Sequence, residues 1–566
     1  MKRSRRILVP YDVRSPVSGD WLLLDRNEGP RPPLSLLRNL KLESSELLRR
    51  YPDPGPLESL LASRFGVDPD RVLVTAGADD AIDRCFRAFA GGGGAVVYTV
   101  PSFAMLERYA ALSGARVEEI EWYGGPFPLE RLLARIDRRT ALVVLVSPNN
   151  PTGATIGPRV LAAVARASCA PVLLDHAYVE YSSVDLTSLA LELGNVVVVR
   201  TFSKAWGLAG LRVGYVLGSA EAIRKLRAAG GPYPVSSLSL LIASEKVRGG
   251  AAQVAKHVKK VRGEREFLAK KLREWKVKVW PSSASFVLGD FGDRASFVRD
   301  ALAARKILVR DFSSSFGLKG CLRISLPGEK RAFQRLTDVL ALILSPDVVL
   351  FDLDGVLADV RRSYDWCISR TAREFGVAVG PGQIAAARAK GGANDDWALT
   401  RSLLQAGGVE VSLSAVRRRF QRRYLGDSAR PGLREKERLL VSRELLEQLA
   451  ARFKLGIVTG RPGEEAFWFL KRHSVEDLFD VVVAREDAPA KPSSAPVQVA
   501  MRRLGASRAW FLGDTPDDMR AASRAGVLGI GVLPPGVDRS TWIQVLKEAG
   551  AVWVLKRAGE VRRLLP

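Results

Sequence analysis

Residues 347–359 read DVVLFDLDGVLAD, an apolar run that ends in two aspartates, Asp352 and Asp354. The run does not alternate with polar residues, which is typical of a strand buried on both faces of a parallel sheet. Ligand sites of such sheets form at the carboxyl ends of the strands. The stretch therefore predicts an α/β domain that starts near residue 347 and carries a carboxylate pair at its site edge.

Similar apolar runs recur on both sides of this stretch, separated by helical segments. Both halves of the chain are therefore expected to be α/β, with parallel-dominated sheets covered by helices. A helical, Arg-rich segment from about 360 to 445 interrupts the second series. The runs are RVLVTAG (71–77), GAVVYTV (94–100), ALVVLVSP (141–148), APVLLDHAY (170–178), NVVVVRTFS (195–203), KLGIVTG (454–460), DVVVARE (480–486), RAWFLGD (508–514) and GVLGIGV (526–532).

Composition excludes several classes of function. The apolar runs are far shorter than the roughly 20 residues that span a bilayer, and the N-terminus has no sustained apolar segment, so we expect a cytoplasmic protein without a membrane partner. The net charge is +25, but 61 acids accompany the scattered basic residues, so nucleic-acid binding is not expected. Four distant cysteines and three histidines argue against a zinc site or a histidine-centred triad.

Four stretches of the first half end successive predicted strands with residues suited to binding an aldehyde cofactor. Lys204 in TFSKAWGLAGLRVGY (201–215) could form a Schiff base. Asp175 in LLDHAYVEY (173–181) could pair with a pyridinium nitrogen. Asn150 precedes a turn in SPNNPTG (147–153), and Gly77 begins a helix whose free N–H groups could bind a phosphate. Taken alone, each stretch could be merely a surface lysine, a turn or a helix start. The four stretches together, in this order at the ends of predicted strands, indicate a site.

With these four pieces, residues 1–345 resemble a fold-type-I, pyridoxal-phosphate-dependent aminotransferase. Within that class, RYPDPGPLESLLASRFGV (50–67), VLVTAGADDAI (72–82) and CLRISL (321–326) are similar to histidinol-phosphate aminotransferases. The resemblance implies that Lys204 binds the cofactor aldehyde and shuttles the proton, while Asp175 pairs with the ring nitrogen. It also implies cofactor contacts from Ala78, Asp79, Phe103, Asn150, Tyr178, Ser203 and Arg212, from Tyr51 of a second subunit in a homodimer, and substrate-anion contacts from Arg310 and Arg323.

The sequence departs from that family at three places. Phe103 stands where a tyrosine is usual, so ring stacking is kept and a hydroxyl is lost. RNEGP (26–30) replaces ANENP, which puts the substrate contacts of Asn27 and Glu28 in doubt. His176 follows Asp175 where glutamate is frequent, and we interpret it either as a residue that supports the site residues from behind or as a packing residue. The same framework also serves a threonine-phosphate decarboxylase and aromatic aminotransferases.

Three further strand ends add to the Asp352/Asp354 pair in the second half. KLGIVTGRP (454–462) supplies Thr459, AREDAPAKP (484–492) supplies Lys491, and WFLGDTPDDM (510–519) supplies Asp514 and Asp518. The set suits phosphoryl transfer: Asp352 attacks phosphorus, and Asp354 protonates the leaving oxygen and then activates water. Thr459 and Lys491 would bind the transferring phosphoryl group. Magnesium would be held among Asp352, Asp354, Asp514 and Asp518.

These motifs make residues 346–566 similar to the haloacid dehalogenase superfamily, with the second acid favouring phosphate esters. The insertion resembles a helical cap, in which GGANDDWALT (391–400), with Asn394, Asp396 and Trp397, is either a specificity loop or a polar surface turn. The predicted domains are an aminotransferase at 1–345 (large domain 45–230, small domain 1–44 and 231–345) and a hydrolase at 346–566 (core 346–360 and 446–566, cap 361–445).

The two resemblances together imply a bifunctional enzyme of histidine biosynthesis. The first half would convert imidazole-acetol phosphate and glutamate to histidinol phosphate, and the second would remove the phosphate with Mg²⁺. Two alternatives stay open: a phosphatase for another small ester, and a second domain that acts as a binding or regulatory module. The five intact residues Asp352, Asp354, Thr459, Lys491 and Asp514 argue against the module.

Overall fold

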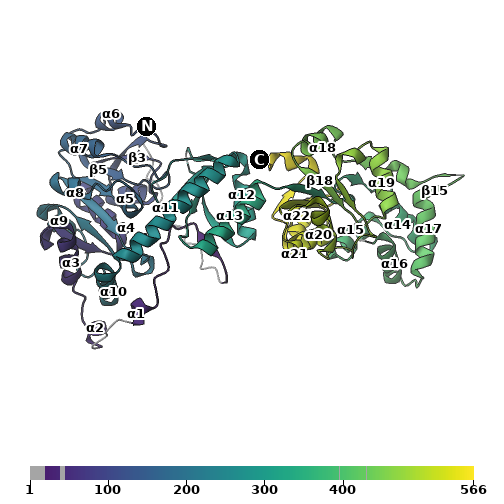
Figure 1. Ribbon diagram of the computed structural model, residues 1–566, viewed down its shortest axis with the longest axis horizontal. Helices are drawn as coiled ribbons and strands as arrows, with labels where there is room; N and C mark the ends of the chain where they lie inside the picture. The colour runs from purple at the N-terminus through teal and green to yellow at the C-terminus, as the bar shows by residue number, and fades with distance from the viewer. Residues whose placement is uncertain (1–18, 39–44, 316, 394, 429, 566) are drawn as a thin grey trace. The chain divides into compact units, whose positions relative to one another are not determined.

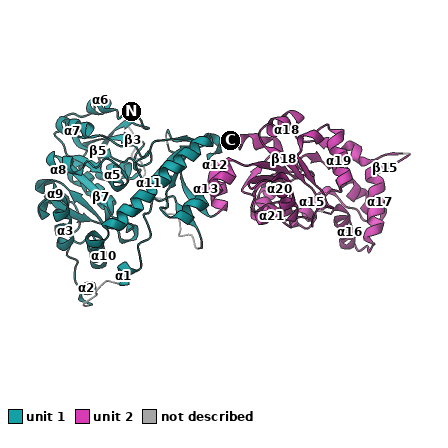
Figure 2. Cartoon of the chain, viewed as in Figure 1, with its two compact units in different colours: residues 1–295, 306–336 teal, residues 296–305, 337–566 magenta. Residues whose placement is uncertain are grey.

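The computed structural model describes residues 19–38, 45–315, 317–393, 395–428 and 430–565. It contains two compact units, coloured separately in Figure 2. Unit 1 comprises the described residues up to Ala295 together with Lys306–Leu336. Unit 2 comprises Ser296–Arg305 and the described residues from Thr337 onward.

The main sheet of unit 1 has seven strands in the order β2-β8-β7-β6-β5-β3-β4. Every neighbouring pair is parallel except the two that involve β8. The predicted strand RVLVTAG therefore pairs antiparallel, at the sheet edge next to β8. The bounds are β2 (Val72–Thr75), β3 (Ala95–Val100), β4 (Arg116–Glu121), β5 (Thr140–Val146), β6 (Val172–Asp175), β7 (Val196–Thr201) and β8 (Gly214–Leu217).

Helices cover this sheet (Figure 1). The helix α4 (Gly77–Ala90) buries Ile82, Cys85 and Phe86 against Val144 and Val199 of the sheet. Burying such side chains contributes about 1.5–3 kcal/mol each, so α4 is fixed with its N-terminus at the strand ends. The other helices are α1 (Ser35–Arg38), α2 (Glu46–Arg49), α3 (Gly55–Phe65), α5 (Met105–Ser113), α6 (Leu129–Leu133), α7 (Pro158–Ala167), α8 (Thr187–Glu192), α9 (Ala220–Ala228), α10 (Ser237–Gly249) and α11 (Ala251–Glu274).

A second sheet of unit 1 joins the two ends of its sequence. Its order is β1-β11-β12-β10-β9, and β1 (Leu22–Leu24) pairs in parallel with β11 (Ile307–Asp311). The remaining strands are β9 (Lys278–Val279), β10 (Phe286–Asp290) and β12 (Cys321–Ser325). This pairing brings the segment after β1 next to residues more than 290 positions later, since Asn27 N–H donates to Ser325 Oγ at 3.2 Å.

The main sheet of unit 2 is wholly parallel, in the order β19-β18-β13-β20-β21-β22. Its strands are β13 (Val348–Phe351), β18 (Lys454–Val458), β19 (Val481–Val483), β20 (Ala509–Gly513), β21 (Leu528–Val532) and β22 (Trp553–Leu555). The α/β prediction is thus confirmed for both halves. Its helices are α12 (Ala295–Ala304), most of which lies in unit 2, α18 (Arg443–Ala450), α19 (Gly463–Arg472), α20 (Ala495–Leu504), α21 (Pro516–Ala525) and α22 (Arg539–Glu548), and α13 (Lys330–Leu344) runs from unit 1 into unit 2.

Among the described residues, four α-helices lie between β13 and α18 in the sequence and form a separate layer of unit 2: α14 (Tyr364–Glu374), α15 (Pro381–Lys390), α16 (Asp396–Ala406) and α17 (Leu413–Leu425). Helices α14, α16 and α17 pack on one another, and Tyr364, Phe420 and Tyr424 form their aromatic core. Short strand pairs, β14 (Ala358–Asp359) with β17 (Arg438–Leu439) and β15 (Gly426–Asp427) with β16 (Arg430–Pro431), flank this cap layer.

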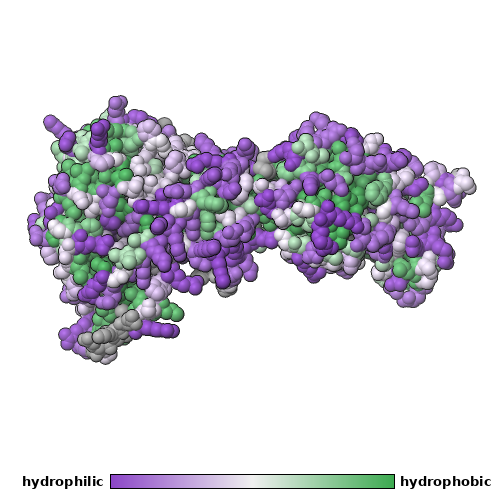
Figure 3. All heavy atoms as spheres, in the orientation of Figure 1, coloured by the Kyte–Doolittle hydropathy of each residue, from purple (hydrophilic) through white to green (hydrophobic). Residues whose placement is uncertain are grey.

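Within the described residues, no helix is both long and apolar enough to cross a membrane. The visible face of each unit carries hydrophilic side chains with smaller groups of hydrophobic ones between them (Figure 3).

Candidate active sites

The first site surrounds Lys204, which follows β7 in a half-buried position. Its Nζ donates to the carbonyl oxygen of Arg26 at 3.3 Å and lies 5.5 Å from the ring centroid of Tyr178. Gly29 passes directly over the lysine loop, because a Cβ there would lie 1.7 Å from the Lys204 carbonyl oxygen. Residues 26–30 therefore form one wall of the lysine site.

Asp175 ends β6 and is buried. Burial raises its pKa to about 6; the hydrogen bond from the Ala177 N–H lowers it, the charge of Asp79 raises it, and the charge of Lys204 lowers it again. The negative charge of this buried carboxylate is only weakly compensated, so the carboxylate suits an ion pair with a cationic ring nitrogen.

Gly77, Arg212 and Ser203 lie close together at the start of α4. Gly77 adopts φ +82°, and a Cβ there would lie 2.6 Å from an Arg212 terminal nitrogen. Arg212 donates to Asp79 at 2.9 Å and to Ser203 Oγ at 3.3 Å. The N-terminus of α4, at Gly77, has no side-chain cap, so its N–H groups, including that of Ala78, and the guanidinium together suit a phosphate.

Arg323 on β12 links the strand-end turn to the second sheet. It donates to Asn150 Oδ1 at 2.5 Å and to the Asp25 carbonyl oxygen at 2.7 Å, and its guanidinium lies over the ring of Phe286 at 5.1 Å. Arg310 is its direct partner in the β11–β12 register, and paired residues share one face of a sheet. The two predicted substrate arginines therefore lie side by side.

Asn27 is a site residue that sequence reasoning left in doubt. It is buried, adopts φ +55° and donates from Nδ2 to the Tyr178 hydroxyl at 2.9 Å. That bond orients the phenol beside Lys204. The signal was present in the sequence as the Asn of RNEGP, but its partner lies 151 positions away.

Three other predicted residues lie as follows. Phe103 is partly buried against the core under α4. Tyr51 is 79% exposed and stacks on Tyr233 with ring centroids 4.3 Å apart. His176 is buried, neither ring nitrogen has a hydrogen-bond partner among the described residues, and burial with the nearby charge of Arg200 lowers its pKa to about 3. His176 is thus a neutral packing side chain.

The second site gathers acids around Lys491. Its Nζ donates to Asp352 Oδ1 at 2.8 Å and to the Val458 carbonyl oxygen at 3.2 Å, and pairs with Asp518 at 2.5 Å. All three side chains are buried. Burial and the neighbouring acids raise the pKa of Asp352, although Lys491 lowers it.

Asp352, Asp514 and Asp518 each place a carboxylate oxygen within 4.8 Å of the others. Burial, Asp352 and Asp518 raise the pKa of Asp514 well above its ordinary value. Asp514 Oδ1 is buried without a hydrogen-bond partner in the described part of the chain. Mutually repelling oxygens of this kind fit a hard divalent cation such as Mg²⁺.

Asp354, predicted as a further metal ligand, lies outside this cluster and meets Arg461 instead. Its Oδ1 accepts from Arg461 Nε at 2.7 Å and from a terminal nitrogen at 2.5 Å. The same guanidinium donates to Glu437 at 2.9 Å and to the Tyr424 hydroxyl at 3.2 Å. Arg461 and Glu437 are fully buried, whereas Asp354 is 31% exposed. Arg461 thereby connects Asp354 to Tyr424 on cap helix α17.

The predicted residues Thr459, Asp396 and Trp397 have different surroundings. Thr459 is buried at the end of β18, and its Oγ1 accepts from the Arg461 N–H at 3.1 Å. Asp396 lines a cavity of about 370 Å³ together with Asp352, Asp354, Lys491 and Asp514. Trp397 is buried between the guanidiniums of Arg417 and Arg485, and Asn394 lies outside the described residues.

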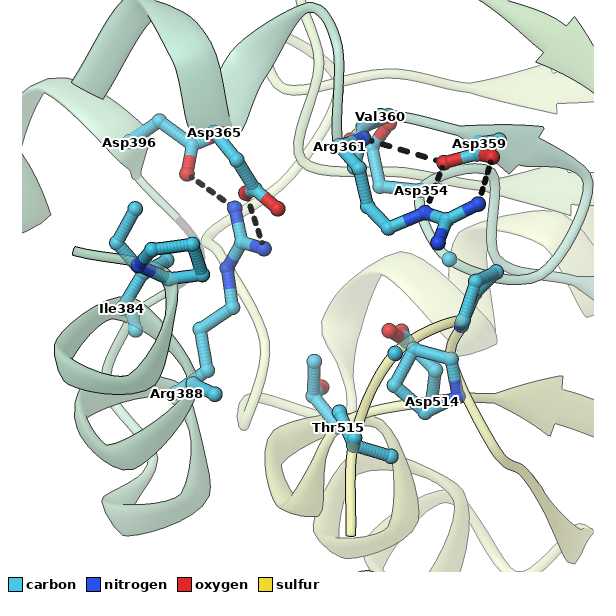
Figure 4. Close-up of a pocket in the computed structure, with 18 of the residues that line it drawn as sticks. Asp354, Asp359, Val360, Arg361, Asp365, Ile384, Arg388, Asp396, Asp514 and Thr515 are labelled. Carbon is cyan, nitrogen blue, oxygen red and sulfur yellow. Dashed lines mark hydrogen bonds and ion pairs between the residues drawn. The ribbon is translucent and has the colours of Figure 1, made fainter. Parts of the chain in front are cut away.

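Figure 4 shows two arginines in that cavity which sequence reasoning missed. Arg361 pairs with Asp359 at 2.7 Å, and Arg388 lies between Asp365 and Asp396. Arg461 directly follows the Thr459-Gly460 motif, which could have drawn attention to it. Nothing in the sequence marked Arg388.

Comparisons with known proteins match this division. The family profile "Aminotransferase class I and II" covers residues 19–340, and "Haloacid dehalogenase-like hydrolase" covers 349–532. A histidinol-phosphate aminotransferase of Thermoanaerobacter pseudethanolicus is 36% identical over 312 residues, covering 54% of this chain and 88% of the relative. An imidazoleglycerol-phosphate dehydratase of Phytophthora nicotianae is 39% identical over 235 residues, covering 38% of this chain and 52% of the relative.

A solved structure supports the fold of the first half. Histidinol-phosphate aminotransferase from Sinorhizobium meliloti, crystallised with pyridoxal-5'-phosphate, superposes with a TM-score of 0.50 at 24% identity, covering 56% of this chain and 90% of that one. The chain belongs to the class I and II aminotransferase family and carries, in the same polypeptide, a haloacid dehalogenase-like hydrolase domain.

Proposed function

We propose that the chain is a bifunctional enzyme that transfers an amino group to imidazole-acetol phosphate and then removes the phosphate from the histidinol phosphate formed. The observation that carries the proposal is that one polypeptide holds both sites: Lys204 with Asp175, and Lys491 with Asp352 and Asp514. Relatives named for histidinol phosphate and imidazoleglycerol phosphate support the choice of an imidazole-bearing substrate.

In the first site, pyridoxal phosphate would supply an electron sink when bound. Asp175 would face its ring nitrogen, the α4 N-terminus with Ser203 and Arg212 would hold its phosphate, and Tyr178 and Asn150 would hold its phenolic oxygen. Lys204 would take up and return the proton at the substrate α-carbon, because its amine is lightly held and half-buried. Phe103 would stack against the ring.

The substrate anions would meet Arg323 and Arg310. Arg323 is fixed in place by Asn150 and the Asp25 carbonyl, so it costs little entropy to bind a carboxylate or a phosphate bidentately. Glutamate as amino donor and the phosphorylated ketone as acceptor both present such an anion. The exposed Tyr51 suits contact with a second subunit in a homodimer.

In the second site, Asp352 would attack phosphorus, the P–O bond to the alcohol would break, and Asp354 would give its proton to the leaving oxygen. Asp354 would then take a proton from the water that cleaves the acyl phosphate and regenerates Asp352. Lys491 and Thr459 would offset charge on the phosphoryl oxygens. Mg²⁺ at Asp352, Asp514 and Asp518 would supply further charge compensation.

The test mixes the purified full-length protein, pyridoxal phosphate and Mg²⁺ with glutamate and imidazole-acetol phosphate. We expect 2-oxoglutarate, histidinol and inorganic phosphate in equal amounts. The Asp352→Asn variant should stop at histidinol phosphate, with phosphate release reduced by about a thousandfold or more. Asp347→Asn, at the other end of the same strand, is the matched control and should complete both steps.

Other outcomes would redirect the proposal. Accumulation of histidinol phosphate by the wild-type protein would remove that ester from the second site. Faster reaction with an aromatic amino acid or decarboxylation of threonine phosphate would reassign the first site. Full phosphate release by Asp352→Asn would remove Asp352 from the nucleophile role.

A further inference from the structure

The phosphatase cavity has two chemically different sides. The core side carries the phosphoryl-transfer residues Asp352, Lys491 and Asp514. The cap side is built from α14, α15 and the start of α16, which contribute Asp365, Arg388 and Asp396. A phosphate ester that reaches Asp352 must place the remainder of its alcohol against this cap side, so the cap residues determine which esters fit.

Charge on the cap side is unbalanced. One guanidinium, that of Arg388, serves two carboxylates: Asp365 at 2.7 Å and Asp396 at 3.0 Å. All three side chains are 80% or more buried, and Figure 4 shows Arg388 reaching between the two acids. The other cavity arginine, Arg361, has its own acid, Asp359. The cap side therefore carries an excess negative charge of one.

The pKa of Asp396 is shifted by burial and by the neighbouring charges. Burial raises it to about 6, Arg388 lowers it, and the charges of Asp354 and Asp365 raise it again. The imbalance itself is shown by the ion pairs, in which a single buried guanidinium is shared by two carboxylates. A second positive charge brought by a ligand would be attracted to this place, whereas an anionic tail would be repelled.

Apolar side chains complete the cap side. Trp366, Ile384 and Ala385 line the same cavity. They would contact the carbon skeleton or a ring of the alcohol and exclude water from the charged group, which strengthens its ion pair. Such a lining suits a short organic chain with one positive charge.

Described residues on both sides of Asp396, the first residue of α16, are hydrogen-bonded within unit 2. The Gly392 N–H donates to Asp517 Oδ2 at 2.6 Å, and Asp395 accepts from the Trp397 N–H at 3.0 Å and from Arg485 at 2.5 Å. Asp396 is therefore held at a defined place rather than on a free surface turn, which lowers the entropic cost of using it for recognition.

We propose that the second domain selects phosphomonoesters whose alcohol carries a cationic group, an ammonium or imidazolium, and that Asp396 and Asp365 are the residues that select it. This inference rests on the proposed phosphatase activity and names its substrate class. Histidinol phosphate is one member of the class, and simple aminoalkyl phosphates are others.

The test measures Mg²⁺-dependent hydrolysis by the full-length protein. The substrates are 3-aminopropyl phosphate, propyl phosphate, phosphoglycolate, histidinol phosphate and its analogue without the amino group. We expect kcat/KM for 3-aminopropyl phosphate to exceed that for propyl phosphate by about tenfold or more, since a hydrogen-bonded charge contributes roughly 1.5–3 kcal/mol. Phosphoglycolate should be the poorest of these substrates.

Amino-acid substitutions test which residues cause the preference for cationic esters. Asp396→Asn and Asp365→Asn should each remove most of the cationic preference while kcat for propyl phosphate changes little, and Asp396→Glu, which keeps the charge, should retain it. Glu374→Gln is the matched control, because Glu374 lies on α14 like Asp365 but pairs with Arg423. Should the Asn variants not fold, inhibition of the wild-type protein by 3-aminopropylphosphonate and by propylphosphonate gives the same comparison.

Equal kcat/KM for the cationic and neutral esters, or a preference for phosphoglycolate, would overturn the inference. So would a cationic preference that survives in Asp396→Asn and Asp365→Asn. Preference for 3-aminopropyl phosphate without turnover of histidinol phosphate would sustain the inference and remove the proposed physiological ester. Turnover of histidinol phosphate together with equal kcat/KM for 3-aminopropyl phosphate and propyl phosphate would do the reverse, and no hydrolysis of any ester would overturn both.

Discussion

The two candidate sites hold their lysines in opposite ways. Lys204 is half-buried and donates to a backbone carbonyl at 3.3 Å. Lys491 is buried and contacts two carboxylates at 2.8 and 2.5 Å and a carbonyl at 3.2 Å. Both lie beyond parallel strands of an α/β sheet, so the fold alone does not decide what a strand-end lysine does.

The difference follows from the acids nearby. Asp175 is the buried acid of the first site and influences Lys204 through its charge, which leaves the amine available for proton transfer. Asp352 and Asp518 bind Lys491 directly, which keeps it charged and fixed. A lysine with a single backbone hydrogen bond is available for proton transfer. A lysine bound by two carboxylates instead compensates their buried charge. Each prediction below tests that contrast.

Replacing Lys204 should have the largest effect on activity and almost none on stability. Lys204→Ala is expected to abolish the visible absorbance of the lysine-bound cofactor and to lower transamination by about a thousandfold or more. Because Lys204 compensates no buried ion pair, the midpoint of thermal unfolding of the cofactor-free protein should stay unchanged. Absorbance spectra, glutamate turnover and calorimetry check this.

Phosphate release by Lys204→Ala should equal that of the wild type, which is the internal control. Wild-type absorbance in the variant would refute the assignment of Lys204. A large fall in thermal stability would show that Lys204 is a support like Lys491, and the contrast would fail.

Replacing Lys491 should damage stability as well as activity. Lys491→Met leaves Asp352 and Asp518 buried without their cation, which costs about 3–5 kcal/mol when one partner of a buried pair is removed. We expect denaturant unfolding of the hydrolase domain at a lower midpoint, and partial recovery with millimolar Mg²⁺, which would neutralise the same acids. Lys454→Met, a lysine on β18 that contacts the Leu504 carbonyl, is the control. An unchanged midpoint in Lys491→Met would contradict the supporting role.

How much was predictable depends on where the partners lie in the sequence. Asp175, Asp352 and Asp514 each follow an apolar run directly, and Lys204 lies three residues after the end of β7, so the sequence pattern places all four at a sheet edge. Arg388 reaches its acids only because helices α14, α15 and α16 pack as they do. No local periodicity encodes that packing, and the charge imbalance of the cap could not be inferred from it.

The same reason explains Asn27 and Arg461. Asn27 meets Tyr178 because β1 pairs with β11, a pairing between distant short strands. Arg461 follows a recognised motif, yet its contacts with Asp354 and Glu437 require the chain between β13 and β18 to return over the strand ends. Residues near a motif were predictable, whereas the charges that neutralise them were not.

Arg461 extends the comparison to an arginine held by two acids. Arg461→Met should destabilise the hydrolase domain by about 3 kcal/mol, because Glu437 is fully buried and would lose its charged partner. The double variant Arg461→Met with Glu437→Gln should regain most of that loss, since no unpaired charge remains. Urea unfolding checks both. Equal losses in the single and double variants would mean that packing, not charge, is what Arg461 supplies.

The last prediction concerns Asp175, the buried carboxylate of the first site, whose negative charge is only weakly compensated. Its effect on stability depends on pH. Its pKa of about 6 in the folded protein lies above the ordinary aspartate pKa of 3.8, so the folded state binds the proton more tightly than the unfolded state. Its contribution therefore favours folding at acid pH, and stability is lost as the pH rises from about 4 to about 6. Above pH 6 the cofactor-free protein carries the whole of this penalty.

Asp175→Asn should remove that penalty. We expect the cofactor-free variant to unfold at a higher temperature than the wild type at pH 7.5 and at nearly the same temperature at pH 4.5, while its affinity for pyridoxal phosphate falls. Asp185→Asn, an acid that Arg200 already compensates, should not be stabilising at either pH. A variant less stable than the wild type at pH 7.5 would show that Asp175 is already neutralised in the free protein. The charge of Asp175 would then be compensated as fully as the charges around Lys491. The difference between Lys204 and Lys491 would need another explanation.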